Sequence, residues 1–109
     1  MIALQLALLL LTVHFVADFL FQSDWMAVNK SSRMLPLLVH IAVYTACLIP
    51  FGFWFAMTNG LAHLITDSIT SRVTSALWKK EKRHWFFVVI GLDQLIHTAT
   101  LLFTASRLL

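Results

Sequence analysis

Four long apolar segments fill most of this 109-residue chain and limit the folds that are open to it. Hydrophobic residues make up 60% of the sequence, charged residues only 12%, and the mean hydropathy is +0.83. A soluble domain of this size cannot bury so much apolar surface, whereas a bilayer can cover it. Segments that cross lipid must satisfy their own backbone hydrogen bonds, which requires helices. The sequence therefore predicts one all-α membrane domain spanning residues 1–109.

We expect four transmembrane helices in an up-down bundle, over residues 2–22, 35–49, 54–75 and 85–108. A helix needs about 20 residues to cross about 30 Å of hydrocarbon, and the second segment is the shortest of the four. Pro36 stands at a tolerated first-turn position, and Pro50 with Gly52 predicts a tight reversal. The first segment lacks a basic start and carries ionisable residues, so we interpret it as a retained span rather than a signal peptide.

Basic residues indicate how these helices are oriented. All but one of them fall in or near the two loops on one side: Lys30, Arg33, Arg72, Lys79, Lys80, Lys82 and Arg83. Because positive charge marks cytoplasmic loops, both termini are expected outside, in a multi-pass protein of the inner (cytoplasmic) membrane. The basic run at 79–83 favours contact with anionic lipid headgroups, and we expect no nucleic-acid partner.

Three His/Asp pairs interrupt the apolar segments, each with a spacing of four: His14 with Asp18, His63 with Asp67, and Asp93 with His97. This spacing places both side chains on one helix face. Five His and five acidic residues scattered at random would give about 0.5 such pairs. Ionisable groups at membrane depth are costly, so they indicate a functional site. A single pair of this kind is more often a local ion pair, but three pairs predict one shared site.

The pairs are expected at one depth, roughly 6 to 18 Å from the cytoplasmic surface, because helices rise 1.5 Å per residue. Imidazole and carboxylate are the usual ligands of zinc, manganese and iron. The predicted metal ligands are His14, Asp18, His40, His63, Asp67, Asp93 and His97. Seven ligands exceed the needs of one tetrahedral ion, so we expect divalent metal, foremost zinc, with two ions as the better fit. The lone Cys47 excludes a disulfide framework and a Cys-based zinc site.

Catalytic and substrate-binding roles are expected at neighbouring positions. Asp67 or His40 would act as the general base. A polar stripe on the third segment, together with the end of the first segment, predicts substrate contacts from Gln22, Asn59, Ser71 and Arg72. Arg72 and the hydroxyls would bind a phosphate entering from the headgroup region. Alternatively, the hydroxyls only join helices to one another or bond their own carbonyls.

Four motifs carry a resemblance to a known family: HFVADFLFQSDWMAVNK, LLVHIAVYT, NGLAHLITDSITSR and GLDQLIH. In these the chain resembles the small bacterial and phage membrane proteins grouped as domain of unknown function 3307. The resemblance implies an integral protein of the bacterial inner membrane and gives no reaction. The His/Asp helices are also similar, as analogy only, to those of membrane-bound metal-dependent hydrolases and helical zinc phospholipases.

These observations favour a membrane-embedded, metal-dependent hydrolase that acts on a phosphoester or related bond of a lipid or lipid-linked substrate. Three other classes stay open. The same groups could carry protons or divalent cations across the membrane. Histidines from facing helices could bind haem, although buried acids beside nearly every histidine argue against it. The polar layer could also only fix helix register in a membrane interaction protein. A homodimer would shield the polar faces better than a monomer.

Overall fold

The computed structural model describes residues 2–109, and within that range all regular structure is helical. The elements in chain order are α1 (Leu4–Phe15), η1 (Val16–Leu20, a π-helical turn), α2 (Asp24–Asn29), α3 (Met34–Leu48), η2 (Ile49–Phe51, a 3-10 turn), α4 (Phe53–Lys79) and α5 (Arg83–Leu108). The all-α prediction is confirmed. The reversal expected at Pro50 and Gly52 is the short η2 turn and the residue that follows it.

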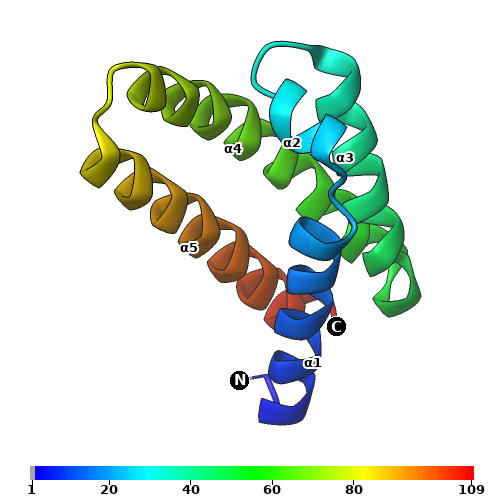
Figure 1. The fold of residues 1–109 in the computed structure, drawn as a ribbon. Coiled ribbons are helices and arrows are strands. Elements are labelled where there is room, and N and C mark those ends of the chain that lie inside the picture. The colour runs from blue at the N-terminus through cyan, green and yellow to red at the C-terminus, as the bar shows by residue number, and fades with distance from the viewer. Residues whose placement is uncertain (1) are drawn as a thin grey trace.

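The four longer helices alternate in direction along the chain, as Figure 1 shows. Helix α4 packs between α3 and α5, while α1 contacts α3 and α5. The short helix α2 lies against α3 only. The α4–α5 hairpin leans away from α2 and α3 at its loop end, whereas both termini lie together at the opposite end of the molecule (Figure 1). The two basic loops are therefore at one end and the termini at the other.

Two helical stretches are long and apolar enough to cross a membrane: Met34–Phe51 and Arg83–Leu108. The stretch Leu4–Leu20 is apolar but one residue short of the usual minimum, because the chain leaves the helix before α2. Helix α4 is long enough at 27 residues, but its buried polar face lowers its hydropathy. The chain is thus all-helical with two candidate membrane spans, and the four-span arrangement goes beyond this finding.

The distribution of side chains is inverted relative to a soluble protein. Buried polar or charged side chains are as common as buried apolar ones, and they include five of the six members of the His/Asp pairs at 4% exposure or less. Large apolar side chains are instead exposed along the outer faces of the helices, as on α4 at Leu61, Ile65 and Ile69. Water does not favour such a surface, whereas hydrocarbon would cover it without cost. This pattern agrees with the membrane association that the two apolar helices suggest.

Helices α3 and α4 approach each other closely at Gly60. A β-carbon at this position would overlap the Thr45 hydroxyl oxygen and lie 3.3 Å from Thr45 Cβ. The hydroxyl of Thr45 donates to the carbonyl of Ile41 over 2.8 Å, which holds the side chain in place. Gly91 on α5 provides a contrast, since a β-carbon there would meet no atom within 4 Å. Packing therefore requires glycine at position 60 but not at position 91.

Gly60→Leu is expected to lower the free energy of unfolding by about 1–3 kcal/mol, because overpacking forces neighbouring side chains to move. Gly91→Leu makes the same change on α5 and is expected to leave stability unchanged or raise it, because leucine is the better helix former. Thermal unfolding of both variants in detergent measures the difference. An equal loss of stability in the two variants would contradict the close contact of α3 with α4 at Gly60.

Candidate metal centre

The His/Asp layer is built around the carboxylate of Asp18, which the π-turn η1 presents to the neighbouring helices. Its Oδ1 atom lies 2.9 Å from His40 Nε2 on α3 and 3.0 Å from His63 Nε2 on α4. Its Oδ2 atom accepts a hydrogen bond from Gln94 Nε2 on α5 over 3.0 Å. Side chains from three other helices thus meet one carboxylate that is 4% exposed. Wide π-turns of this kind are frequent at functional sites.

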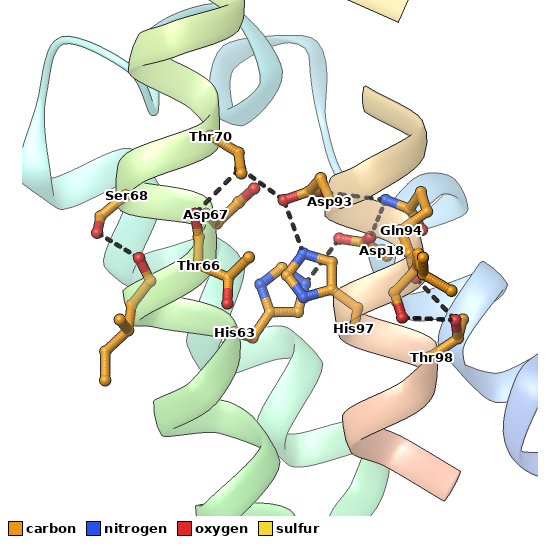
Figure 2. A network of polar contacts seen from close by, with 12 residues as sticks. Asp18, His63, Thr66, Asp67, Ser68, Thr70, Asp93, Gln94, His97 and Thr98 are labelled. Atoms are coloured by element: carbon orange, nitrogen blue, oxygen red, sulfur yellow. Dashed lines mark hydrogen bonds and ion pairs between the residues drawn. The ribbon is translucent and has the colours of Figure 1, made fainter. Parts of the chain in front are cut away.

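Most of the close contacts run between helices rather than within the His/Asp pairs. His14 Nε2 is 3.8 Å from its own partner Asp18, which is longer than the contacts of Asp18 with α3 and α4. Only Asp93 and His97 are close within one helix, with 3.1 Å between Oδ1 and Nε2. Figure 2 shows Asp18, His63, Asp93 and His97 directed toward one another. The spacing of four therefore brings the residues to one layer, and the packing of helices joins them.

Three overlapping groups of side chains have ligand atoms within 4.8 Å of one another. They are Asp18 with His40 and His63, then His63 with Asp67 and His97, and finally Asp18 with Asp93 and His97. Bonds of about 2.0–2.1 Å in a tetrahedral zinc site place neighbouring ligand atoms about 3.3 Å apart. The contacts of Asp18 are close to that separation. Because the groups share Asp18, His63 and His97, this donor set fits two adjacent cations better than one.

The imidazoles keep unused nitrogen atoms at the layer. His40 Nδ1 and His63 Nδ1 are buried without a hydrogen-bond partner in residues 2–109, whereas His97 Nε2 has only its 3.1 Å contact with Asp93 Oδ1. The rings of His63 and His97 also stack, with centroids 3.8 Å apart and planes 17° apart. Two imidazolium cations would repel each other at that distance, so the stack suits neutral rings. Neutral imidazole is the form that binds metal.

His14 was predicted as a ligand, and its geometry does not favour this role. Gln94 donates through Nε2 to Asp18 and Asp93, so its Oε1 atom accepts from His14 Nε2 over 2.9 Å. The other ring nitrogen, Nδ1, must then accept from the Tyr44 hydroxyl, also over 2.9 Å. This tautomer follows from the hydrogen-bond network. His14 has no free lone pair, and it orients Gln94 and Tyr44 beside the centre.

Lys30 is a member of the site that the spacing of four did not indicate. It follows α2, and its ammonium group reaches Asp67 Oδ2 over 2.9 Å, while its side chain is 17% exposed. His40 Nε2 lies 3.7 Å from the same oxygen atom. The nearby Asp93 is held by the Thr70 hydroxyl, which donates to its Oδ1. Lys30, Thr70 and Gln94 thus complete the polar layer around the predicted carboxylates.

A cavity of about 590 Å³ adjoins the layer, within the usual range for ligand pockets. It begins at the carboxylates of Asp18, Asp67 and Asp93 and follows α4 toward Trp78 and Lys79. Its remaining polar walls come from Gln22, Lys30, Ser31, Thr70, Ser71, Thr74, Ser75 and Gln94. Apolar walls come from Phe19, Ala27, Val28, Phe86 and Ile90. The cavity therefore joins a charged inner end to a largely apolar rim at the end of the basic loops.

The four predicted substrate-binding residues separate in the structure. Gln22 and Ser71 line the cavity, and the Gln22 Oε1 and Ser71 Oγ atoms are buried without a partner in residues 2–109. Asn59 lies outside the cavity lining and donates to Thr104 Oγ1 over 2.7 Å, which links α4 to α5. Arg72 is exposed, and its guanidinium donates to the Ser68 carbonyl on its own helix. Asn59 and Arg72 therefore lie outside this cavity, and their contact with a substrate stays a prediction.

On the side toward the termini, apolar side chains close the layer. Leu10, Leu48, Phe55 and Leu101 are each at most 1% exposed and belong to one packed cluster. Each stands one helical turn from a polar member of the layer or from Asn59. Among residues 2–109, a small void lies on this side beside Tyr44 and Asn59, and it is too small to hold a water molecule. Access to the layer is thus from the side of the basic loops.

Comparison with known proteins identifies a family and no activity. A search of curated proteins and of solved structures found no match. A family model described as "Protein of unknown function (DUF3307)" matches residues 6–108, which include every member of the polar layer. The expected resemblance is confirmed over nearly the whole length of the chain. This all-helical chain belongs to the family of unknown function DUF3307.

Proposed function

We propose that the chain is an integral protein of the inner membrane, with four spans and both termini outside. The apolar outer faces and the polar interior support this arrangement, because only a hydrocarbon environment favours both. The longest dimension of 42 Å matches a bilayer with its headgroup regions. Helix α4 then crosses lipid despite its low hydropathy, since its polar side chains face the other helices. The basic loops face the cytoplasm.

We propose further that the layer holds divalent metal, with zinc the best fit to mixed imidazole and carboxylate donors. Charge supports this. Three carboxylates and one ammonium group leave −3 + 1 = −2 when the imidazoles are neutral. Unbalanced buried charge is very unfavourable, and one divalent cation would offset it. A second cation would leave a net charge of +2 at the inner end of the cavity, which suits an anionic substrate.

The reaction that best fits this site is hydrolysis of a phosphoester or related bond in a lipid or lipid-linked substrate. Bound divalent cations supply Lewis-acid activation of a water and of a phosphoryl oxygen. Asp67 would bind a cation through one carboxylate oxygen and would take a proton from the attacking water through the other, because its carboxylate lines the cavity. His40 is fully buried and lies outside the cavity lining, so it serves as a ligand rather than as the base.

The observation that carries this proposal is the direct opening of the cavity onto the His/Asp layer. A polar layer that only fixed helix register would need no adjoining cavity of about 590 Å³. Transport of protons or cations would need a path on both sides of the layer. The apolar cluster at Leu10, Leu48 and Leu101 opposes such a path. Uptake of zinc or protons into proteoliposomes that contain the chain would therefore contradict the proposal.

Detergent-purified protein is expected to contain one to two zinc ions, or equivalent divalent ions, per chain by elemental analysis. Asp18→Ala and His63→Ala should each lower the metal content to below about a tenth, because removing one ligand from a buried centre weakens affinity by orders of magnitude. His84→Ala and Asp24→Asn are matched controls, since both residues are exposed and outside the layer. Metal that persists in Asp18→Ala would argue against this centre.

The zinc-loaded protein is expected to hydrolyse a chromogenic aryl phosphodiester and to lose this activity with a chelator. Asp67→Asn should reduce kcat by about 100-fold or more, because general-base catalysis contributes about 10²–10⁴. His14→Gln should retain metal but show altered activity, since His14 orients Gln94 rather than binding the ion. Full turnover by metal-free protein would refute the hydrolase assignment, as would full turnover by Asp67→Asn.

A further inference from the structure

The cavity beside the metal centre has the lining that an amphiphile requires. Its inner end is charged, α4 contributes hydroxyl groups along one wall, and Phe19, Val28 and Phe86 line the other side. Val28 is 72% exposed and Phe19 is 47% exposed, so this wall continues onto the outer apolar surface. Helix α2 packs on α3 and has no backbone contact with α4 or α5. The exposed side chains of Phe19 and Val28 therefore offer an apolar chain a continuous surface from the cavity to the outside.

Two buried polar atoms in the cavity wall lack a hydrogen-bond partner. Gln22 Oε1 is a buried acceptor without a donor, and only an N–H or O–H group can satisfy it. Ser71 Oγ is also unpartnered, and Ser71 is 7% exposed on the cavity wall. Buried polar atoms are rarely left unpaired in folded proteins, so each points to a bound group. A head that carries hydroxyl groups would serve both residues.

Lys30 supplies the cation for an anionic head. In the structure its ammonium group pairs with Asp67, at the position where a cation bound to the group of His63, Asp67 and His97 would compete with it. Like charges that share one carboxylate group repel each other, so an occupied centre would favour release of Lys30. The freed side chain lies on the cavity wall and would meet a phosphate there, in place of the exposed Arg72.

We propose that this cavity binds a lipid whose head carries a phosphate and at least one hydroxyl group, with Lys30 contacting the phosphate and Gln22 and Ser71 contacting the hydroxyl groups. The inference rests on the proposed metal-dependent function and names the substrate class of the same site. The tail leaves past Phe19 and Val28. The head lies against the carboxylates at the inner end.

The test uses the zinc-loaded full chain in nonionic detergent and a phosphinate analogue of phosphatidylglycerol, in which methylene groups replace both bridging oxygens so that neither bond to phosphorus can be hydrolysed. Native mass spectrometry measures the bound analogue per chain. Lys30→Met should weaken binding by about 10-fold or more, because hydrogen bonds to charged groups are the stronger ones. Lys30→Arg should restore most of it, while Lys80→Met, in the loop outside the cavity, should have no effect. Unchanged binding by Lys30→Met at full metal content would overturn the assignment of Lys30.

Lipid analogues with different headgroups test the proposed hydroxyl contacts. The matching phosphatidylpropanol analogue has the same anionic charge but no hydroxyl donor, and it should bind several-fold more weakly than the phosphatidylglycerol analogue. Gln22→Leu should reduce the difference in affinity between the two analogues without lowering the metal content. Equal binding of both analogues to the unaltered chain would overturn the proposed head chemistry. Equal binding of tail-free glycerol 3-phosphate would overturn the lipid assignment in favour of a soluble phosphate ester.

Failure of this inference is distinguishable from failure of the proposed function. If the chain holds zinc and hydrolyses the aryl phosphodiester but neither analogue binds, only the lipid site is overturned. If the chain binds the phosphatidylglycerol analogue but takes up no divalent metal, the hydrolase proposal is overturned, and so is the release of Lys30 by a cation, while the cavity itself is supported as a lipid site. Metal content, turnover and lipid binding are therefore measured on the same preparations.

Discussion

The fold depends on how one buried carboxylate is satisfied. Asp18 is 4% exposed and lies among helices with apolar outer faces, where an isolated negative charge would be prohibitively costly. Imidazoles from α3 and α4 and an amide from α5 approach its two oxygen atoms, so three helices must pack at one depth and one rotation for this charge to be tolerated. The π-turn at Val16–Leu20 belongs to the same requirement, since it presents Asp18 to its partners.

The same requirement explains why the layer is closed on one side and open on the other. Beyond the layer toward the termini, the helices converge on small and apolar residues, and at Gly60 α4 approaches Thr45 of α3. Toward the basic loops, the α4–α5 hairpin leans away from α2 (Figure 1). The cavity lies on this side of the layer. The polar layer thus forms the floor of a pocket and not the middle of a channel. This geometry favours a binding or catalytic role over transport.

The spacing of four predicted which residues lie in the layer, but it did not predict which of their atoms contact one another. Residues four apart share a helix face in any α-helix, so the depth and the inward direction of Asp18, His63 and His97 followed from the sequence. Which nitrogen faces which oxygen depends on helix rotation, which local sequence does not determine. For that reason His14 was assigned as a ligand, although the structure bonds both of its nitrogens to Tyr44 and Gln94.

The spacing of four could not predict side chains that reach the layer from segments outside the His/Asp pairs. Lys30 follows a short helix, and its reach to Asp67 depends on the way α2 lies on α3. Arg72 had the better position in the sequence, at the predicted end of a span, but α4 continues to Lys79 and leaves it on an exposed face. The polar stripe of α4 likewise divides in two, because Asn59 bonds across to α5 whereas Asp67 and Ser71 reach the cavity.

The pairing of Lys30 with Asp67 has a thermodynamic consequence for the proposed site. The ammonium group can offset the Asp67 charge or contact a ligand phosphate, but a single rigid geometry does not serve both. A cation that binds Asp67 replaces Lys30 in the first role and frees it for the second. By linkage, an anionic ligand that holds Lys30 must then raise the affinity for the cation by the same factor. Metal and anionic lipid would therefore bind this layer cooperatively, without any movement of the four long helices.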